Sequence, residues 1–133
     1  MRAFLLNVMV VGLAVAALTD MHLGAQRNPD AAKVQNPVAS TPESIVAGKA
    51  SYQRFCANCH GSNAEGGPGN DLVPPAPDLT GTTWKHGSTD GEIFTVIKNG
   101  VPPDFNMAAW GAQGFRDQDI WNVVNYVRSL AKK

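Results

Sequence analysis

The sequence predicts an all-α fold for this 133-residue chain. Three segments place apolar side chains at the spacing of three and four residues that marks one face of a helix, and each has residues suited to its ends. No run of alternating apolar and polar residues is long enough to predict a strand. Between Gly61 and His86, clusters of glycine and proline predict a long loop instead.

The first 25 residues have the pattern of a secretory signal peptide. Arg2 supplies the positive charge, residues 3–18 are almost entirely apolar, and residues 23–25 offer a cleavage site of small side chains. The apolar run is shorter than the ~20 residues of a membrane span. We therefore expect residues 1–25 to be a cleaved signal peptide and the chain to be exported, with retention as a membrane anchor as the alternative.

Residues 26–41 are expected to form a flexible linker. The segment is rich in Asn, Pro, Ala and Gln and shows no apolar periodicity. It is either the disordered N-terminus of the mature chain or a tether that lets a membrane-held domain swing between partners. The globular domain then comprises residues 42–133, which is short for a domain stabilised by an apolar core alone.

The first helix is expected to begin at Pro42, with Thr41 as its N-cap and Glu43 placing a carboxylate in the first turn. One face carries residues at spacings of three, four and three and leads directly to Cys56: Ile45, Gly48, Tyr52 and Phe55. A glycine in a helix lowers its stability. We therefore expect another helix to cross closely at Gly48, and an incidental glycine is the alternative.

The second helix is expected after the long loop. Thr89 and Glu92 form a T-x-x-E capping box, and an apolar stripe lies within residues 93–97. Asn99 and Gly100 end the segment, since glycine suits the left-handed position after a helix. This helix is expected to span about ten residues, close to the ordinary length of three turns.

The third helix closes the chain, with aspartates near its start and lysines at its end, in keeping with the helix dipole. Its apolar stripe consists of Ile120, Val123, Val124, Val127 and Leu130. We expect Tyr126 to lie where this helix crosses the first one, against Gly48 and Tyr52. Val123 is expected at the same crossing.

The chemistry-bearing feature of the chain is the sequence C-x-x-C-H at residues 56–60, the attachment signature of c-type haem. Two thiols at this spacing lie on one short turn, so each can add to one vinyl group of the same porphyrin. The imidazole of His60 then falls under the iron as the proximal ligand. Cys56 and Cys59 are the only cysteines in the chain. A buried porphyrin also supplies apolar mass that a small domain lacks.

Other roles for the two cysteines agree less well with the sequence. A structural zinc site needs four ligands, usually two such pairs, and the remaining histidines are His22 and His86. A thioredoxin-like redox pair would lie in a βαβ pattern, whereas here a helix is followed by a loop. A disulfide between Cys56 and Cys59 would constrain very little chain.

The charge balance gives no sign of a nucleic-acid or acidic-membrane partner. The formal net charge is zero for the whole chain. It stays zero without residues 1–25, because Arg2 and Asp20 leave together. A strongly basic surface of the kind that binds polyanions is therefore not predicted.

The chain resembles the class I c-type cytochromes, in particular the bacterial members with a single haem, over about residues 47–130. The resemblance rests on features that occur in the family's order: Gly48, Tyr52, the C-A-N-C-H pentad, Ala76-Pro77-Asp78-Leu79, Met107 in a proline-containing loop and the helix around Tyr126. It implies three main helices and long loops wrapped around one covalently bound haem. The loop from His60 to Pro77 is longer than in mitochondrial members.

The resemblance also implies roles for single residues. His60 is similar to the proximal iron ligand, and Met107 to the distal one. Pro77 resembles the proline whose carbonyl accepts the proximal imidazole N–H, although Pro74 and Pro75 lie nearby. Leu79 resembles the aliphatic residue that packs on the porphyrin.

Met107 is also the best available sixth ligand for the iron, because the other three methionines, Met1, Met9 and Met21, all lie in the expected signal peptide. Pro102 and Pro103 stiffen the approach to it. A methionine that fills a gap in the core is the alternative. His86 is expected to be a solvated loop residue, and it is the other candidate for the sixth ligand.

The three tryptophans are assigned mainly to packing. Trp84 is expected either to anchor the loop against the haem edge or core, or to donate a hydrogen bond to a haem propionate. Trp110 and Trp121 are expected to pack around the haem and the last helix.

These features predict a periplasmic or otherwise exported electron carrier whose haem iron accepts one electron from a donor protein and passes it to an acceptor. No residue is required as acid, base or nucleophile, so we do not expect an enzyme. One alternative is a haem peroxidase or gas-binding domain with an open iron position. Another is a haem subunit of a dehydrogenase or oxidase complex.

Overall fold

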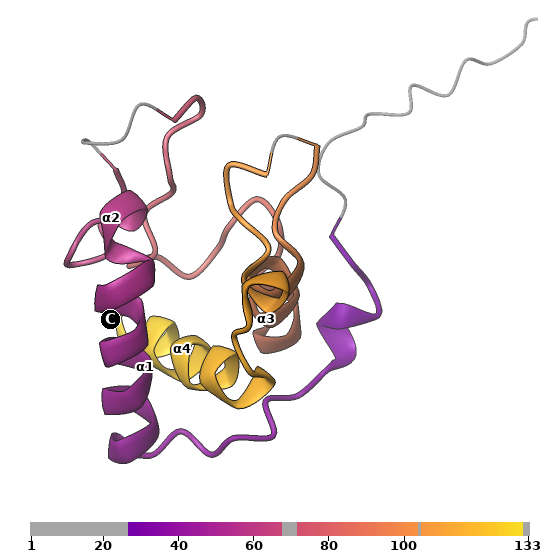
Figure 1. Ribbon diagram of the computed structural model, residues 1–133. Helices are drawn as coiled ribbons and strands as arrows, with labels where there is room; N and C mark the ends of the chain where they lie inside the picture. Colours follow the sequence, from indigo (N-terminus) through magenta and orange to yellow (C-terminus); the bar gives the residue numbers. More distant parts are fainter. Residues whose placement is uncertain (1–26, 68–71, 104, 132–133) are drawn as a thin grey trace, which may run out of the picture.

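The computed structural model describes residues 27–67, 72–103 and 105–131, and the predicted signal peptide lies outside them. Its elements, in chain order, are η1 (Ala31–Lys33), α1 (Pro42–Phe55), α2 (Ala57–His60), α3 (Asp90–Asn99), η2 (Trp110–Gln113) and α4 (Asp117–Ser129). Figure 1 shows α2 on the end of α1, with α4 passing beside α1 and α3 beyond it. The described part of the chain contains no strand, so the all-α prediction is confirmed.

The predicted N-caps of the first two long helices are confirmed, whereas α4 ends at Ser129, before the lysines that were predicted at its end. At the start of α1, the Thr41 hydroxyl accepts from the Ser44 amide at 3.2 Å. At the start of α3, Thr89 and Glu92 form the complete capping box, and α3 ends at Gly100 with a φ of 69°. No helix within residues 27–67, 72–103 or 105–131 is both long enough and apolar enough to cross a membrane.

α1 and α4 cross at Gly48, as the sequence predicts. A Cβ atom at this position would lie 2.0 Å from the Asn122 carbonyl oxygen and 3.0 Å from the Tyr126 Cβ, so only glycine fits. Beside the crossing, the rings of Tyr52 and Tyr126 pack with centroids 5.1 Å apart. Tyr52 is fully buried. Val123, which was also expected at this crossing, belongs instead to the larger core cluster.

The core has two parts. The larger, between α3 and α4, consists of Ile93, Ile97, Ile120, Trp121, Val123, Val124 and Val127. The smaller, beside the helix crossing, consists of Tyr52, Ala64 and Tyr126. Leu79 packs against both clusters from the long loop. The loop that follows the haem motif is therefore anchored to both halves of the core.

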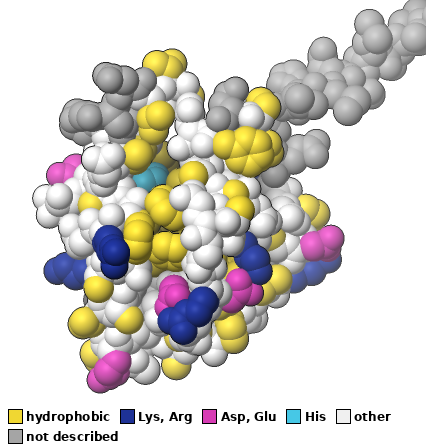
Figure 2. Space-filling model, in the orientation of Figure 1, with side chains coloured by type: hydrophobic (Ala, Val, Ile, Leu, Met, Phe, Trp, Pro, Cys, Tyr) yellow, Lys and Arg dark blue, Asp and Glu magenta, His cyan; other side chains and the backbone are white. Residues whose placement is uncertain are grey.

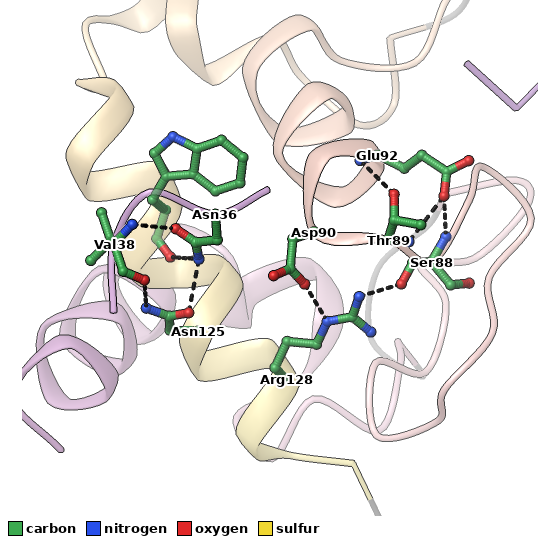
Figure 3. A network of polar contacts seen from close by, with 9 residues as sticks. Asn36, Val38, Ser88, Thr89, Asp90, Glu92, Asn125 and Arg128 are labelled. Carbon is green, nitrogen blue, oxygen red and sulfur yellow. Dashed lines mark hydrogen bonds and ion pairs between the residues drawn. The ribbon is translucent and has the colours of Figure 1, made fainter. Parts of the chain in front are cut away.

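The segment 27–41, which was expected to belong to a flexible linker, contacts α4 at Asn36 and Val38 (Figure 3) and α3 at Ala31. Asn36 donates to the Asn125 side chain at 2.8 Å, and Asn125 donates to the Val38 carbonyl at 3.1 Å. On α3, a Cβ at Gly91 would lie 2.1 Å from the Ala31 carbonyl oxygen, so the segment packs directly on the helix backbone. We call residues 27–41 the N-terminal strap.

A second polar network fixes the turn before α3 (Figure 3). The guanidinium of Arg128 donates to Asp90 at 2.7 Å and also to the Ser88 carbonyl. The Glu92 carboxylate accepts from the amides of Ser88 and Thr89, each at 2.9 Å. The hydrogen bond from the Thr89 amide is the main reason why the pKa of Glu92 lies below its ordinary value, although burial opposes the shift.

The helix crossing predicts a sharp difference between two glycines. Gly48→Ala is expected to lower the free energy of unfolding by about 1–3 kcal/mol, because the added methyl group overlaps the α4 backbone. Gly81→Ala is the matched control, since a Cβ there meets no atom within 4 Å. Denaturant titration of both variants measures the effect. Equal midpoints for the two variants would show that the crossing at Gly48 is not tight.

The Glu92 network predicts a pH dependence of stability. Because the pKa of Glu92 is lowered by folding, its ionised form stabilises the native state above the unfolded-state value of 4.5. This contribution is lost as the pH falls through the lower folded-state pKa. Glu92→Gln is expected to flatten the loss of stability below pH 4.5, measured by thermal unfolding across that range. An acid slope identical to that of wild type would contradict the prediction.

Candidate haem-binding site

The C-x-x-C-H pentad lies where α1 passes into α2. Cys56 is the C-cap of α1 and the N-cap of α2. The amides of Cys59 and His60 donate to the Cys56 carbonyl at 3.1 and 2.9 Å, so the pentad forms one helical turn. Both cysteines are half-buried thiols. The local backbone therefore holds both thiols and the histidine within a single turn, as haem attachment requires.

His60 is buried, and its Nδ1 lies 3.2 Å from the Pro77 carbonyl oxygen. A carbonyl can only accept, so Nδ1 carries the proton and the lone pair is on Nε2. Burial lowers the pKa of His60, and the hydrogen bond to Pro77 opposes that shift. The imidazole is thus neutral near pH 7, oriented by a backbone acceptor, and able to bind a metal through Nε2. The structure brings these two predicted site residues together.

The loop after the pentad is folded back on itself around His60. The Gly66 amide donates to the His60 carbonyl at 2.9 Å, and the Leu79 amide donates to the Ala64 carbonyl at 2.7 Å. A Cβ at Gly66 would lie 3.0 Å from the Asp78 nitrogen, so residues 64–67 pack tightly on residues 76–79. These backbone contacts determine where Pro77 lies relative to the histidine.

Tyr52 connects the helix crossing to the pentad. Its hydroxyl donates to the Gly61 carbonyl at 2.8 Å, immediately after His60. Burial, with smaller contributions from Cys56 and Tyr126, raises the pKa of Tyr52 above its ordinary value, so the hydroxyl stays a donor. The same side chain therefore packs on Tyr126 of α4 and fixes the end of α2.

The environment of the thiols does not resemble a zinc site. Burial, with a smaller contribution from Cys59, raises the pKa of Cys56 to about 11. Among the described residues, no three His, Cys, Asp or Glu side chains form a group that could hold a metal ion. The arrangement suits an iron held by a porphyrin and one histidine from this side.

Met107 lies in the loop between α3 and η2 and is half-buried against the larger core cluster. The loop is tight: the Val101 amide donates to the Met107 carbonyl at 3.0 Å. A Cβ at Gly100 would lie 2.6 Å from the same carbonyl oxygen, so this glycine is required sterically. The Asn106 side chain reaches the Val73 carbonyl at 3.4 Å and connects this loop to the one that carries Pro77.

The two loops project on the same side of the molecule as α2 (Figure 1). Figure 2 shows one histidine on this face, recessed and surrounded by hydrophobic side chains. An apolar recess with a nitrogen ligand fits a porphyrin, whose faces are apolar. The residues present are thus chemically suited to haem.

Trp84 and Trp121 pack in the larger core cluster, the one that Met107 also contacts. The Trp84 indole donates to the Asp78 carbonyl at 2.9 Å, and its ring packs on the larger cluster. Trp121 stacks on Phe94, with centroids 4.0 Å apart. His86 is half-buried, and its pKa is lowered by burial and by the neighbouring Lys85.

Sequence reasoning did not anticipate an aromatic cluster next to Cys56. Phe55 lies 4.7 Å from Phe115 and 5.7 Å from Trp110, measured between ring centroids. Phe55 was part of the predicted α1 face, but the partners come from η2 and the segment after it. Aromatic residues in the short stretch 110–115 were the available signal.

Comparison with known proteins identifies the family. Residues 43–127 match the family described as cytochrome c oxidase, cbb3-type, subunit III. The chain belongs to this family. It is a class I c-type cytochrome, as its C-x-x-C-H turn and helical fold indicate.

Among curated proteins, the chain is similar to cbb3-type cytochrome c oxidase subunits named CcoP. The protein from Rubrivivax gelatinosus is 34% identical over 94 residues, which cover 71% of this chain and 28% of that protein. The protein from Rhodobacter capsulatus is 34% identical over 132 residues, which cover 93% of this chain and 43% of that protein. The chain therefore spans less than half the length of these relatives.

Solved structures give the same fold. Cytochrome cL from Methylophaga aminisulfidivorans superposes with a TM-score of 0.55 at 25% identity, over 68% of this chain and 55% of that one. A chain of the reducing HAO-like protein complex of Kuenenia stuttgartiensis has a TM-score of 0.56 at 26% identity, over 74% of this chain and 50% of that one.

The attachment site gives a direct prediction. Cys56→Ala or Cys59→Ala is expected to remove one thioether and lower the yield of haem-loaded protein, and the double variant is expected to carry no covalent haem. The reason is that no other cysteine exists in the chain. Haem staining after denaturing electrophoresis measures attachment. Asn58→Ala, between the two cysteines, is the control and should keep the haem band; a stained band from the double variant would rule the assignment out.

Proposed function

We propose that this protein is an exported one-electron carrier with a single covalently attached haem c. The observation that carries the proposal is the buried His60, held neutral in one helical turn with both cysteines and oriented by the Pro77 carbonyl. When bound, the haem supplies an iron that alternates between the ferrous and ferric states. Membership of a c-type cytochrome family supports this assignment.

The chain's own residues hold and tune the group. Cys56 and Cys59 would attach it, His60 would offer Nε2 to the iron, and Met107 would offer its thioether from the loop between α3 and η2. A thioether ligand favours the ferrous state and raises the reduction potential. Leu79, which packs against both core clusters, helps to exclude water. Two such ligands would leave no iron position open to a substrate, so the proposal requires no acid, base or nucleophile and no catalytic activity of the chain itself.

The relatives suggest where the carrier works. Because they are subunits of cbb3-type cytochrome c oxidases, we propose that this domain passes electrons within, or to, an oxidase-type assembly. Its partners are then an electron-donor protein and an electron-acceptor protein, and we propose no nucleic-acid partner. Stable co-purification of the tagged full chain with oxidase subunits from its host would favour a subunit, and its absence a free periplasmic shuttle.

The N-terminal segments determine how the domain is presented. We propose that residues 1–25 are a signal peptide that is cleaved. If they are retained instead, they would anchor the domain to the membrane on its periplasmic side. The contacts of Asn36 with Asn125 favour a domain that includes the strap rather than one that begins at residue 42. N-terminal sequencing of the mature protein distinguishes cleavage from retention.

Met107 tests the proposed iron ligation. Met107→Ala is expected to leave haem attached, lower the reduction potential, and open the ferrous iron to carbon monoxide, because the thioether ligand is removed. Optical titration and carbon monoxide binding measure both effects. In wild type, a weak ferric band near the red edge of the visible spectrum, from sulfur-to-iron charge transfer, is expected.

His86→Ala is the matched control and should keep the wild-type potential and closed iron. If Met107→Ala behaves like wild type and His86→Ala opens the iron, the sixth ligand is His86. If wild-type ferrous protein already binds carbon monoxide, the iron is open and a gas-binding or peroxidase function replaces electron transfer.

A further inference from the structure

Three consecutive carbonyls next to the histidine each accept one hydrogen bond. The Ala76 carbonyl accepts from the Gly67 amide at 3.2 Å. The Pro77 carbonyl accepts from His60 Nδ1, also at 3.2 Å. The Asp78 carbonyl accepts from the Trp84 indole at 2.9 Å. The acceptor that orients the histidine is therefore flanked by two peptide groups that are themselves held in place.

The peptide group between Asp78 and Leu79 is held from both sides. The Leu79 amide donates to the Ala64 carbonyl at 2.7 Å, and the Trp84 indole donates to the Asp78 carbonyl at 2.9 Å. The Asp78 carboxylate accepts from the amide and hydroxyl of Thr80 at 2.7 and 2.6 Å. Trp84 is anchored in turn, because its ring packs on the larger core cluster and its amide donates to the Ser88 hydroxyl at 2.8 Å. Trp84 thus connects the core to the backbone beside the histidine's acceptor.

We propose that Trp84 is a positioning residue for the haem iron: by holding the Asp78 carbonyl, it keeps the Pro77 carbonyl on His60 Nδ1 and so sets the donor strength of the proximal imidazole. This inference rests on the proposed function and gives the indole N–H a role different from binding a haem propionate. The link runs from the core through Trp84, Asp78 and Pro77 to His60.

The direction of the effect follows from the chemistry of imidazole. A hydrogen bond from Nδ1–H to a carbonyl increases the basicity of Nε2, and a more basic ligand stabilises ferric iron. Weakening the hydrogen bond from His60 Nδ1 to the Pro77 carbonyl should therefore raise the reduction potential. Simple loss of packing has the opposite expected result, since water reaching the haem stabilises the more highly charged ferric form. The sign of the shift thus separates positioning from a merely structural role.

Trp84→Phe in the full-length holoprotein tests the proposal, because it removes the indole N–H and keeps an aromatic ring on the core. Trp121→Phe is the matched control: it trims an indole that belongs to the larger core cluster itself, stacked on Phe94. Two quantities are measured, namely the reduction potential and the rate of hydrogen exchange at His60 Nδ1 followed by NMR.

Trp84→Phe is expected to raise the reduction potential and to speed exchange at His60 Nδ1, with neither change in Trp121→Phe. Thr80→Val, which removes one hydrogen bond to Asp78, is expected to shift both quantities in the same direction by a smaller amount. An unchanged or lowered potential in Trp84→Phe would overturn the proposal, whatever the exchange rate, and so would exchange at His60 Nδ1 as slow as in wild type.

The proposed function is tested separately by the optical spectrum of the wild-type holoprotein, recorded before the variants are compared. A wild-type spectrum without a histidine-ligated c-type haem would overturn the proposed function. A normal spectrum combined with a Trp84→Phe potential equal to that of wild type would overturn only the positioning role of Trp84.

Discussion

The close crossing of α1 and α4 at Gly48 is the contact on which the rest of the molecule depends. A side chain at this position would overlap the Asn122 carbonyl, so the two backbones touch there. α1 runs on directly into the turn that carries both cysteines and His60. The position of the turn that carries the cysteines and His60 is therefore fixed relative to the core by a contact two helical turns earlier. Tyr52 adds a second connection, because its hydroxyl donates a hydrogen bond to the Gly61 carbonyl.

Beyond that turn, the site is built from loop backbone rather than regular secondary structure. Residues 64–67 and 76–79 are tied by main-chain hydrogen bonds, and the close packing requires Gly66. These contacts place the Pro77 carbonyl within hydrogen-bonding distance of His60 Nδ1. Such an acceptor carries no net charge and does not titrate, which suits a ligand whose donor strength must stay constant while the iron changes its charge.

The helices were predictable because their signals are local. The cap at Thr41, the box at Thr89 and Glu92, and the apolar spacing along α4 all lie within one or two turns of the residues they specify. The pentad specifies its own turn in the same way. The resemblance to c-type cytochromes also pointed to Pro77 among neighbouring prolines, and the structure places that carbonyl against His60.

The contacts that were not predictable join distant parts of the chain through unremarkable residues. Asn36 and Asn125 are 89 positions apart, and nothing in either local pattern marks the pair. Gly91 inside α3 was the available signal that another segment packs there, as Gly48 was for α1. The partner of Trp84 is a backbone carbonyl, and every residue offers one, so the sequence alone could not identify it.

The central proposal is that His60 and Met107 would both hold the iron of a covalently attached haem. The most direct measurement is an NMR spectrum of the reduced protein with methionine methyl groups labelled with carbon-13. Met107 is the only methionine after residue 25. Its methyl resonance should be shifted far upfield, because an iron-bound thioether lies over the porphyrin ring current. A Met107 methyl resonance at the ordinary position for methionine in a protein would contradict the account.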